Sequence, residues 1–256
     1  MDAESLKKNL SIAIEAAQKA GEEILKVYDS DFSVEKKEDK SPLTLADKNS
    51  HEIIFSILSQ TKIPVLSEEG KDIPFNERKN WQHLWIVDPL DGTKEFVRRN
   101  GEFAVNIALI ENEKPIIGVI YSPVKKSLFY ALKNLGAYKK EKNGVEQKLP
   151  LRSRNETFSV CASRSHMNDE TKVFVNELRK KHGEINFIST GSSLKFCLIA
   201  EGIADCYPRF AATMEWDTAS GQIIVEECGK KLIDVTTDKP MLYNREIIRN
   251  NWFVVE

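Results

Sequence analysis

Two aspartates that directly follow an apolar run carry the clearest chemical signal in the chain. The stretch Asp88-Pro-Leu-Asp-Gly-Thr93 comes straight after Leu84-Trp-Ile-Val87. A strand that ends in a tight turn can aim both carboxylates at one point, where like charges repel unless a cation is present. Carboxylate oxygens suit Mg²⁺, and the free N–H groups of a short helix over 93–97 favour an anion such as phosphate. The motif predicts metal and phosphate chemistry, although Asp-Pro and Asp-Gly also occur in turns that only reverse the chain.

Four more acidic residues fall near the expected ends of secondary-structure elements: Asp47, Glu68, Glu69 and Asp217. Each has an ordinary structural explanation beside the chemical one. Aspartate is common at the start of a helix, where Asp47 and Asp217 lie, and Thr44 with Asp47 resembles a capping box. Glu68-Glu69 can equally be a solvated turn. The residues alone leave both explanations open at these positions.

The periodicity of apolar residues predicts an α+β section over 1–152 and an α/β section over 153–256, packed together as one unit. The first section should hold helices packed on a mainly antiparallel sheet, with a strong hairpin signal at Asn143-Gly144. Its expected elements are helices over 5–28 and about 45–60, an edge strand over 32–37, a polar loop over 71–80, and strands over 103–110, 115–121, 127–132 and 137–140. The second should alternate strand 158–162, helix 169–182, strand 185–189, helix 192–202, strand 204–209, helix 217–228 and strand 231–235.

Composition excludes several classes of function. The net charge is −2, so the chain as a whole does not attract nucleic acid, while a local cationic site for one small anion stays possible. The four cysteines show no Cys-x-x-Cys pair, which favours buried free thiols in a reducing compartment over a zinc site or a disulfide framework. An acidic N-terminus and the lack of an apolar run of about 20 residues argue against a secretory signal or a membrane span. We therefore expect a cytoplasmic enzyme with no obligatory membrane partner.

Taken together, the motifs resemble the inositol monophosphatase superfamily. Leu43-Thr-Leu-Ala-Asp47, Ser67-Glu-Glu69, Asp88-Pro-Leu-Asp-Gly-Thr93 and Glu215-Trp-Asp-Thr-Ala-Ser-Gly221 occur in the order seen in that superfamily and span nearly the whole chain. The resemblance implies a layered α-β-α-β-α sandwich and a Mg²⁺-dependent, lithium-sensitive phosphatase with two or three ions per site.

Flanking stretches resemble the bacterial 3′(2′),5′-bisphosphate nucleotidases within that superfamily. They begin at Gly92-Thr-Lys-Glu-Phe, Gly191-Ser-Ser-Leu-Lys195 and Tyr207-Pro-Arg-Phe210. Ala211-Ala212 departs from the family pattern, in which Gly-Pro is expected there. The implied reaction is hydrolysis of adenosine 3′,5′-bisphosphate, a by-product of sulfate assimilation, to AMP and phosphate. An inositol monophosphatase or broad sugar-phosphate phosphatase, and a non-catalytic nucleotide sensor, are the alternatives.

The resemblance also assigns roles residue by residue. One Mg²⁺ would be held by Glu68, Asp88 and the Leu90 carbonyl, a second by Asp88, Asp91 and Asp217, and a looser third near Asp47 and Glu68. Thr93, paired with Asp47, would orient and help deprotonate an attacking water, without a phospho-enzyme.

The substrate is expected to be a small nucleotide bisphosphate, bound by a monomer or a homodimer. Ser192 at a helix start and Lys195 have plainer explanations, as a helix cap and a solvated surface charge, and His166 is as readily a plain loop residue. The full set of expected substrate-binding residues is Leu90, Asp91, Gly92, Thr93, Ser165, His166, Ser192, Ser193, Lys195, Arg209 and Asp217.

Overall fold

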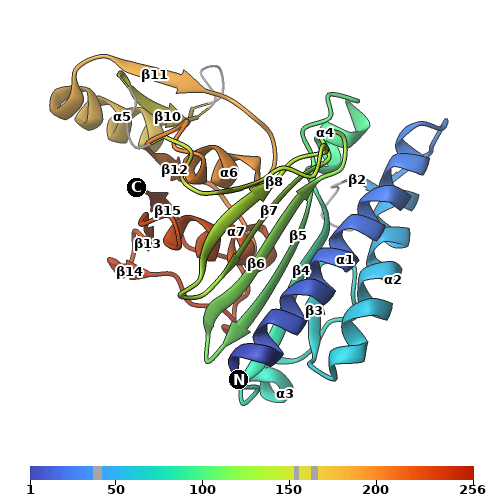
Figure 1. Cartoon of the computed structure of the whole chain (residues 1–256). Coiled ribbons are helices and arrows are strands. Elements are labelled where there is room, and N and C mark those ends of the chain that lie inside the picture. The colour runs from blue at the N-terminus through green and yellow to red at the C-terminus, as the bar shows by residue number, and fades with distance from the viewer. Residues whose placement is uncertain (37–41, 153–155, 163–166) are drawn as a thin grey trace.

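A seven-stranded sheet forms the centre of the fold and carries the acidic turn at one strand end (Figure 1). The computed structural model describes residues 1–36, 42–152, 156–162 and 167–256. The strand order is β3-β4-β5-β6-β7-β8-β9, with β3 parallel to β4 and all later neighbours antiparallel. The strands are β3 (Val65–Ser67), β4 (His83–Asp91), β5 (Ala104–Glu111), β6 (Lys114–Ser122), β7 (Ser127–Leu132), β8 (Gly136–Lys140) and β9 (Glu146–Lys148).

Two long helices cover one face of this sheet, α1 (Ala3–Tyr28) and α2 (Leu45–Leu58). Small side chains at Ala13, Ala17 and Ala20 are fully buried, which lets α1 lie close to its neighbours. The 3-10 helix η1 (Ser59–Thr61) continues α2. No helix in the described part of the chain is both long and apolar enough to cross a membrane.

The opposite face packs against α6 (Leu194–Ala200) and α7 (Glu215–Glu226). Two glycines allow this close approach. A Cβ at Gly118 of β6 would lie 2.4 Å from Cγ2 of Ile223 and 2.4 Å from the carbonyl oxygen of Ser220. A Cβ at Gly221 would lie 2.3 Å from Cγ of Phe196. Helix α7 therefore fits between the sheet and α6 because neither glycine carries a side chain.

A second β layer and an outer helix complete the fold (Figure 1). The layer combines a four-stranded sheet, in the order β12-β15-β13-β14, with the parallel pair β10-β11. The layers run α-β-α-β-α, so the predicted fold class is confirmed. The elements are β10 (Phe158–Cys161), α5 (Asp169–His182), β11 (Ile185–Ile188), β12 (Tyr207–Arg209), β13 (Leu232–Asp234), β14 (Lys239–Pro240) and β15 (Phe253–Val255).

The structure corrects four expectations about elements. The expected loop over 71–80 contains a short helix, α3 (Phe75–Arg78), whose Arg78 is buried and binds the C-terminal region. The expected edge strand over 32–37 is β1 (Val34–Lys36), which pairs with β2 (Pro42–Thr44) apart from the main sheet. Helix α7 begins at Glu215, two residues before the predicted start. Strands β14 and β15 were not predicted, and the division at residue 152 stays a prediction.

We predict that Gly118→Ala lowers the free energy of unfolding by about 1–3 kcal/mol, because the new Cβ forces α7 away from β6. Urea unfolding followed by circular dichroism measures the loss. Gly144→Asn is the control, because a Cβ at Gly144 meets nothing within 4 Å, and it should cost less than about 1 kcal/mol. Equal losses in the two variants would show that close packing is not the role of Gly118.

Candidate active site

An irregularity in the pairing of β4 with β5 places both aspartates of the turn on one face of the sheet. Asp88 pairs with Asn106 and Asp91 pairs with Ala104, so three steps along β4 match two steps along β5. Residues three apart on a regular strand point to opposite faces, whereas directly paired residues share a face. Because Asn106 and Ala104 lie two apart, Asp88 and Asp91 both face α6 and α7. The extra residue of this β-bulge is what brings the two carboxylates together.

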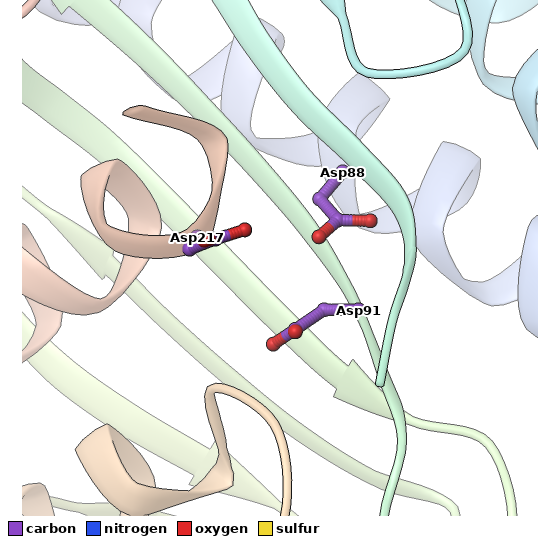
Figure 2. Close-up of side chains that lie close together, drawn as sticks. All are labelled: Asp88, Asp91 and Asp217. Atoms are coloured by element: carbon purple, nitrogen blue, oxygen red, sulfur yellow. The ribbon is translucent and has the colours of Figure 1, made fainter. Parts of the chain in front are cut away.

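Helix α7 supplies the third carboxylate (Figure 2). Asp88, Asp91 and Asp217 each offer an oxygen within 4.8 Å of the other two. Asp217 is the third residue of α7, and its Oδ2 accepts a hydrogen bond of 2.8 Å from the Met214 backbone N–H. The helix-cap explanation for Asp217 is therefore true in part, since one oxygen serves the helix start while the side chain still joins the cluster.

Crowding and burial raise the pKa of these carboxyls. Burial raises the pKa of Asp88 well above its usual range, and the charges of Glu68, Asp91 and Asp217 raise it further. Burial, followed by the charge of Asp91, raises the pKa of Asp217 to about 8. A bound divalent cation would offset both the cost of burying these charges and the repulsion between them. Carboxylate oxygens are the ligands that Mg²⁺ prefers. The residues therefore fit a metal site.

Glu68 approaches the cluster from the neighbouring strand. Strand β3 runs parallel to β4 with Ser67 beside Val87. The next residue of each strand follows in the same register, so the backbone of Glu68 lies beside that of Asp88. Its backbone N–H donates to the Val87 carbonyl at 3.1 Å. Its charge is one of the causes that raise the pKa of Asp88, after burial, so Glu68 lies near the cluster formed by Asp88, Asp91 and Asp217. Glu69 is half-buried beside it.

Asp47 serves both as a helix cap and as a partner for the acidic turn. Its Oδ2 accepts hydrogen bonds from the Thr44 backbone N–H at 2.7 Å and the Thr44 hydroxyl at 2.6 Å, which forms the predicted capping box. Its Oδ1 accepts from the Thr93 hydroxyl at 3.1 Å. The Leu90 carbonyl lies 3.3 Å from the same hydroxyl. Thr93 is the first residue of helix α4 (Thr93–Val97), so the predicted Asp47–Thr93 pair is present.

A cavity of about 600 Å³ opens from the carboxylate cluster toward the start of α6. Gly92 lines it with a backbone φ of +93°, a conformation that favours glycine. Ser192 is not the helix cap: its hydroxyl donates to Oδ2 of Asp91 at 2.7 Å. The Ser193 backbone N–H donates to the same oxygen, and Ser193 occupies the N-cap position of α6 without a side-chain capping bond.

Lys195 and Arg209 are two of the cationic side chains that line the cavity. Lys195 is half-buried, and burial lowers the pKa of its ammonium group. Its Nζ donates to the Ser192 carbonyl at 3.1 Å and lies 5.7 Å from the ring centre of Tyr207, so it is not a solvated surface charge. Within the described residues, the buried Nε of Arg209 has no hydrogen-bond partner. Ser165 and His166 lie outside the described residues.

Sequence reasoning missed several residues of this region, and three of them bear on the carboxylates or the cavity wall. Asn106 is fully buried and contacts both Asp91 and Ser193. Glu95 and Glu102 line the cavity, and Glu102 accepts a hydrogen bond of 2.8 Å from the backbone N–H of Gly191. One signal was available for Asn106, because it is the one polar residue within the otherwise apolar run 103–110.

This fold and this carboxylate cluster define a class of protein. A model described as the inositol monophosphatase family matches residues 5–254, and the chain belongs to that family. The family consists of metal-dependent phosphatases of phosphate monoesters, as the motifs implied. The family predicted from sequence is confirmed.

Named relatives refine the comparison. The chain is similar to the 3′(2′),5′-bisphosphate nucleotidase CysQ of Salmonella typhimurium, with 48% identity over 223 residues that cover 85% of this chain and 87% of that protein. CysQ of Escherichia coli strain K12 is 44% identical over 245 residues, 93% of this chain and 96% of that protein. A crystal structure of CysQ from Bacteroides thetaiotaomicron has a TM-score of 0.88 and 48% identity, covering 97% of both chains.

We predict that the metal-free protein loses stability as the pH rises from about 4 to about 8. Over this window the folded state, in which the pKa of Asp217 is about 8, binds more protons than the unfolded state, so the free energy of unfolding falls. Thermal unfolding in a chelating buffer should show a Tm several degrees lower at pH 8 than at pH 5.5. Asp217→Asn should weaken this slope, and the exposed Asp31→Asn should leave it unchanged. A slope that survives in Asp217→Asn would contradict the prediction.

Proposed function

We propose that the protein is a Mg²⁺-dependent 3′(2′),5′-bisphosphate nucleotidase that converts adenosine 3′,5′-bisphosphate to AMP and phosphate. The observation that carries this proposal is that one cavity is lined by both carboxylates and cationic side chains. Asp91 and Asp217 of the carboxylate cluster line it, and so do Lys195 and Arg209. A substrate with two phosphates can use both the metal site and these cations, whereas an inositol monophosphate has no second phosphate for the cations. The names of the CysQ relatives support the same substrate.

The metal ions would be held by oxygen ligands from four parts of the fold, namely β4, α7, α2 and the residue after β3. Glu68, Asp88 and the Leu90 carbonyl would form one site, and Asp88, Asp91 and Asp217 a second. A third, looser site would lie near Asp47 and Glu68. When bound, Mg²⁺ supplies positive charge for the phosphoryl oxygens and increases the acidity of water. The observed crowding of carboxylates at Asp88 supports this assignment because it is unfavourable without a cation.

Thr93 and Asp47 would orient the attacking water. The Thr93 hydroxyl donates its hydrogen to Oδ1 of Asp47, so the lone pairs of its oxygen can accept a hydrogen bond from water. As the water attacks phosphorus in line with the leaving oxygen, its proton passes to Thr93, and the Thr93 proton passes to Asp47. No covalent phospho-enzyme forms in this scheme.

The second phosphate would lie against the start of α6 and the end of β12. Ser192, Ser193, Lys195 and Arg209 line the cavity there. The lack of a partner for Nε of Arg209 among the described residues supports a ligand there, because a buried N–H without a partner is costly. Ala211 of the departing Ala211-Ala212 pair also lines the cavity. A cytoplasmic location and the choice between monomer and homodimer stay predictions.

We predict fast phosphate release from adenosine 3′,5′-bisphosphate with Mg²⁺, little release from inositol 1-phosphate, and neither reaction in a chelating buffer. The cationic side chains that line the cavity give the bisphosphate an additional favourable contact. Side-by-side measurement of phosphate with both substrates tests this. Preference for the inositol ester would keep the metal site and overturn the substrate assignment. Tight nucleotide binding without release would indicate a sensor.

We predict that Thr93→Ala lowers kcat by about 10²-fold or more with a smaller effect on KM, since water orientation matters mainly in the transition state. Asp91→Asn should lower kcat by a similar or larger factor because it removes a negative charge from the metal site. Steady-state kinetics at saturating Mg²⁺ measures both, and Asp31→Asn is the control. A pure KM effect of Thr93→Ala would argue against its role with water.

A further inference from the structure

Asn106 is a fully buried amide on an apolar face of the central sheet. It lies on β5 between Ala104 and Ala108, on the face that packs against α6 and α7, and its exposed fraction is 0%. Burying an amide without hydrogen bonds costs about 1–3 kcal/mol, so an apolar residue would be the simpler choice for packing. The contacts of Asn106 should therefore explain its presence.

Asn106 joins the acidic turn to the start of α6. Its Nδ2 donates to Oδ2 of Asp91 at 3.3 Å, and its Oδ1 accepts from the Ser193 hydroxyl at 2.7 Å. The backbone N–H of Ser193 donates to the same Oδ2 of Asp91, so hydrogen bonds connect Asn106, Asp91 and Ser193 in a closed ring. The Ser192 hydroxyl donates to that oxygen as well. Three donors thus converge on one oxygen of Asp91, which fixes the plane of the carboxylate and leaves the other oxygen for a cation.

We propose that Asn106 is a positioning residue that sets metal affinity and substrate affinity together. It is not among the residues that line the cavity, and it acts by orienting Asp91 and by holding residues 191–193 at the cavity wall. An amide suits this role because one end donates to the carboxylate and the other accepts from the hydroxyl. An aspartate of the same shape would place a second negative charge against Asp91. The inference rests on the proposed metal site.

Asn106→Leu keeps the branching of the side chain at Cγ, with a somewhat larger volume, and removes both hydrogen bonds. We expect Mn²⁺ affinity, measured by calorimetry on the protein without nucleotide, to fall about 10-fold or more. Steady-state kinetics should use a phosphate ester that the wild type hydrolyses. For Asn106→Leu we expect kcat to return toward the wild-type value at excess Mg²⁺. KM should stay raised, because the segment 191–193 is no longer held. The calorimetry uses no substrate, so its outcome is independent of the nucleotidase proposal.

Two further variants separate positioning from a general packing defect. Ser122→Ala, a buried hydroxyl on the same sheet with no partner among the described residues, should leave Mn²⁺ affinity unchanged. Ser193→Ala removes one bond of the ring at the cavity edge and should weaken Mn²⁺ binding about 3-fold, even if Asn106→Leu does not fold. Wild-type Mn²⁺ affinity in a folded Asn106→Leu, or in Ser193→Ala, would overturn the proposal. So would a kcat loss in Asn106→Leu that excess Mg²⁺ does not restore.

Discussion

Repulsion among buried carboxylates is the constraint on which the rest of the structure depends. Asp88 is 2% exposed and shares a small space with Asp91 and Asp217. Such a cluster persists only if the surrounding elements hold the side chains in place against their own charge. The bulge in β4, the docking of α7 at Gly118 and the ring through Asn106 each supply part of that restraint. The scaffold therefore holds the three carboxylates in an arrangement that fits a cation.

Two of the acidic residues, Asp47 and Asp217, are held in place in the same way at the starts of their helices. Asp47 and Asp217 are each the third residue of a helix, and each accepts a hydrogen bond from the backbone N–H of the residue just before that helix. The positive end of the helix dipole stabilises the carboxylate, and one oxygen stays turned toward the turn at Asp88 to Thr93. Capping and chemistry are thus two uses of one side chain. This explains why residue type alone could not decide between them.

Most of the element order and the acidic cluster followed from the sequence, because both depend on local patterns. Periodicity located nearly every helix, and four ordered motifs located the carboxylates. The bulge could not be predicted, because a spacing of three on a strand indicates opposite faces and the true pairing depends on β5. The hydrogen bonds from Ser192 and Ser193 to Asp91 join residues about a hundred positions apart in the sequence, so no local pattern could predict them. Strands β14 and β15 are two and three residues long, so neither shows an alternating pattern of its own.

The late position of α7 in the chain has a consequence for how the molecule is made. Asp88 and Asp91 are synthesised long before Asp217, and the cluster is complete only when α7 has packed against β6. A growing chain on the ribosome that ends before α7 exposes the apolar face of its sheet and offers a cation two of the three carboxylates. Under the proposed metal assignment, a cation bound by all three would favour the conformation that gathers them and would draw the last-made part of the fold onto the first. Ion binding would then distinguish a finished chain from an interrupted one.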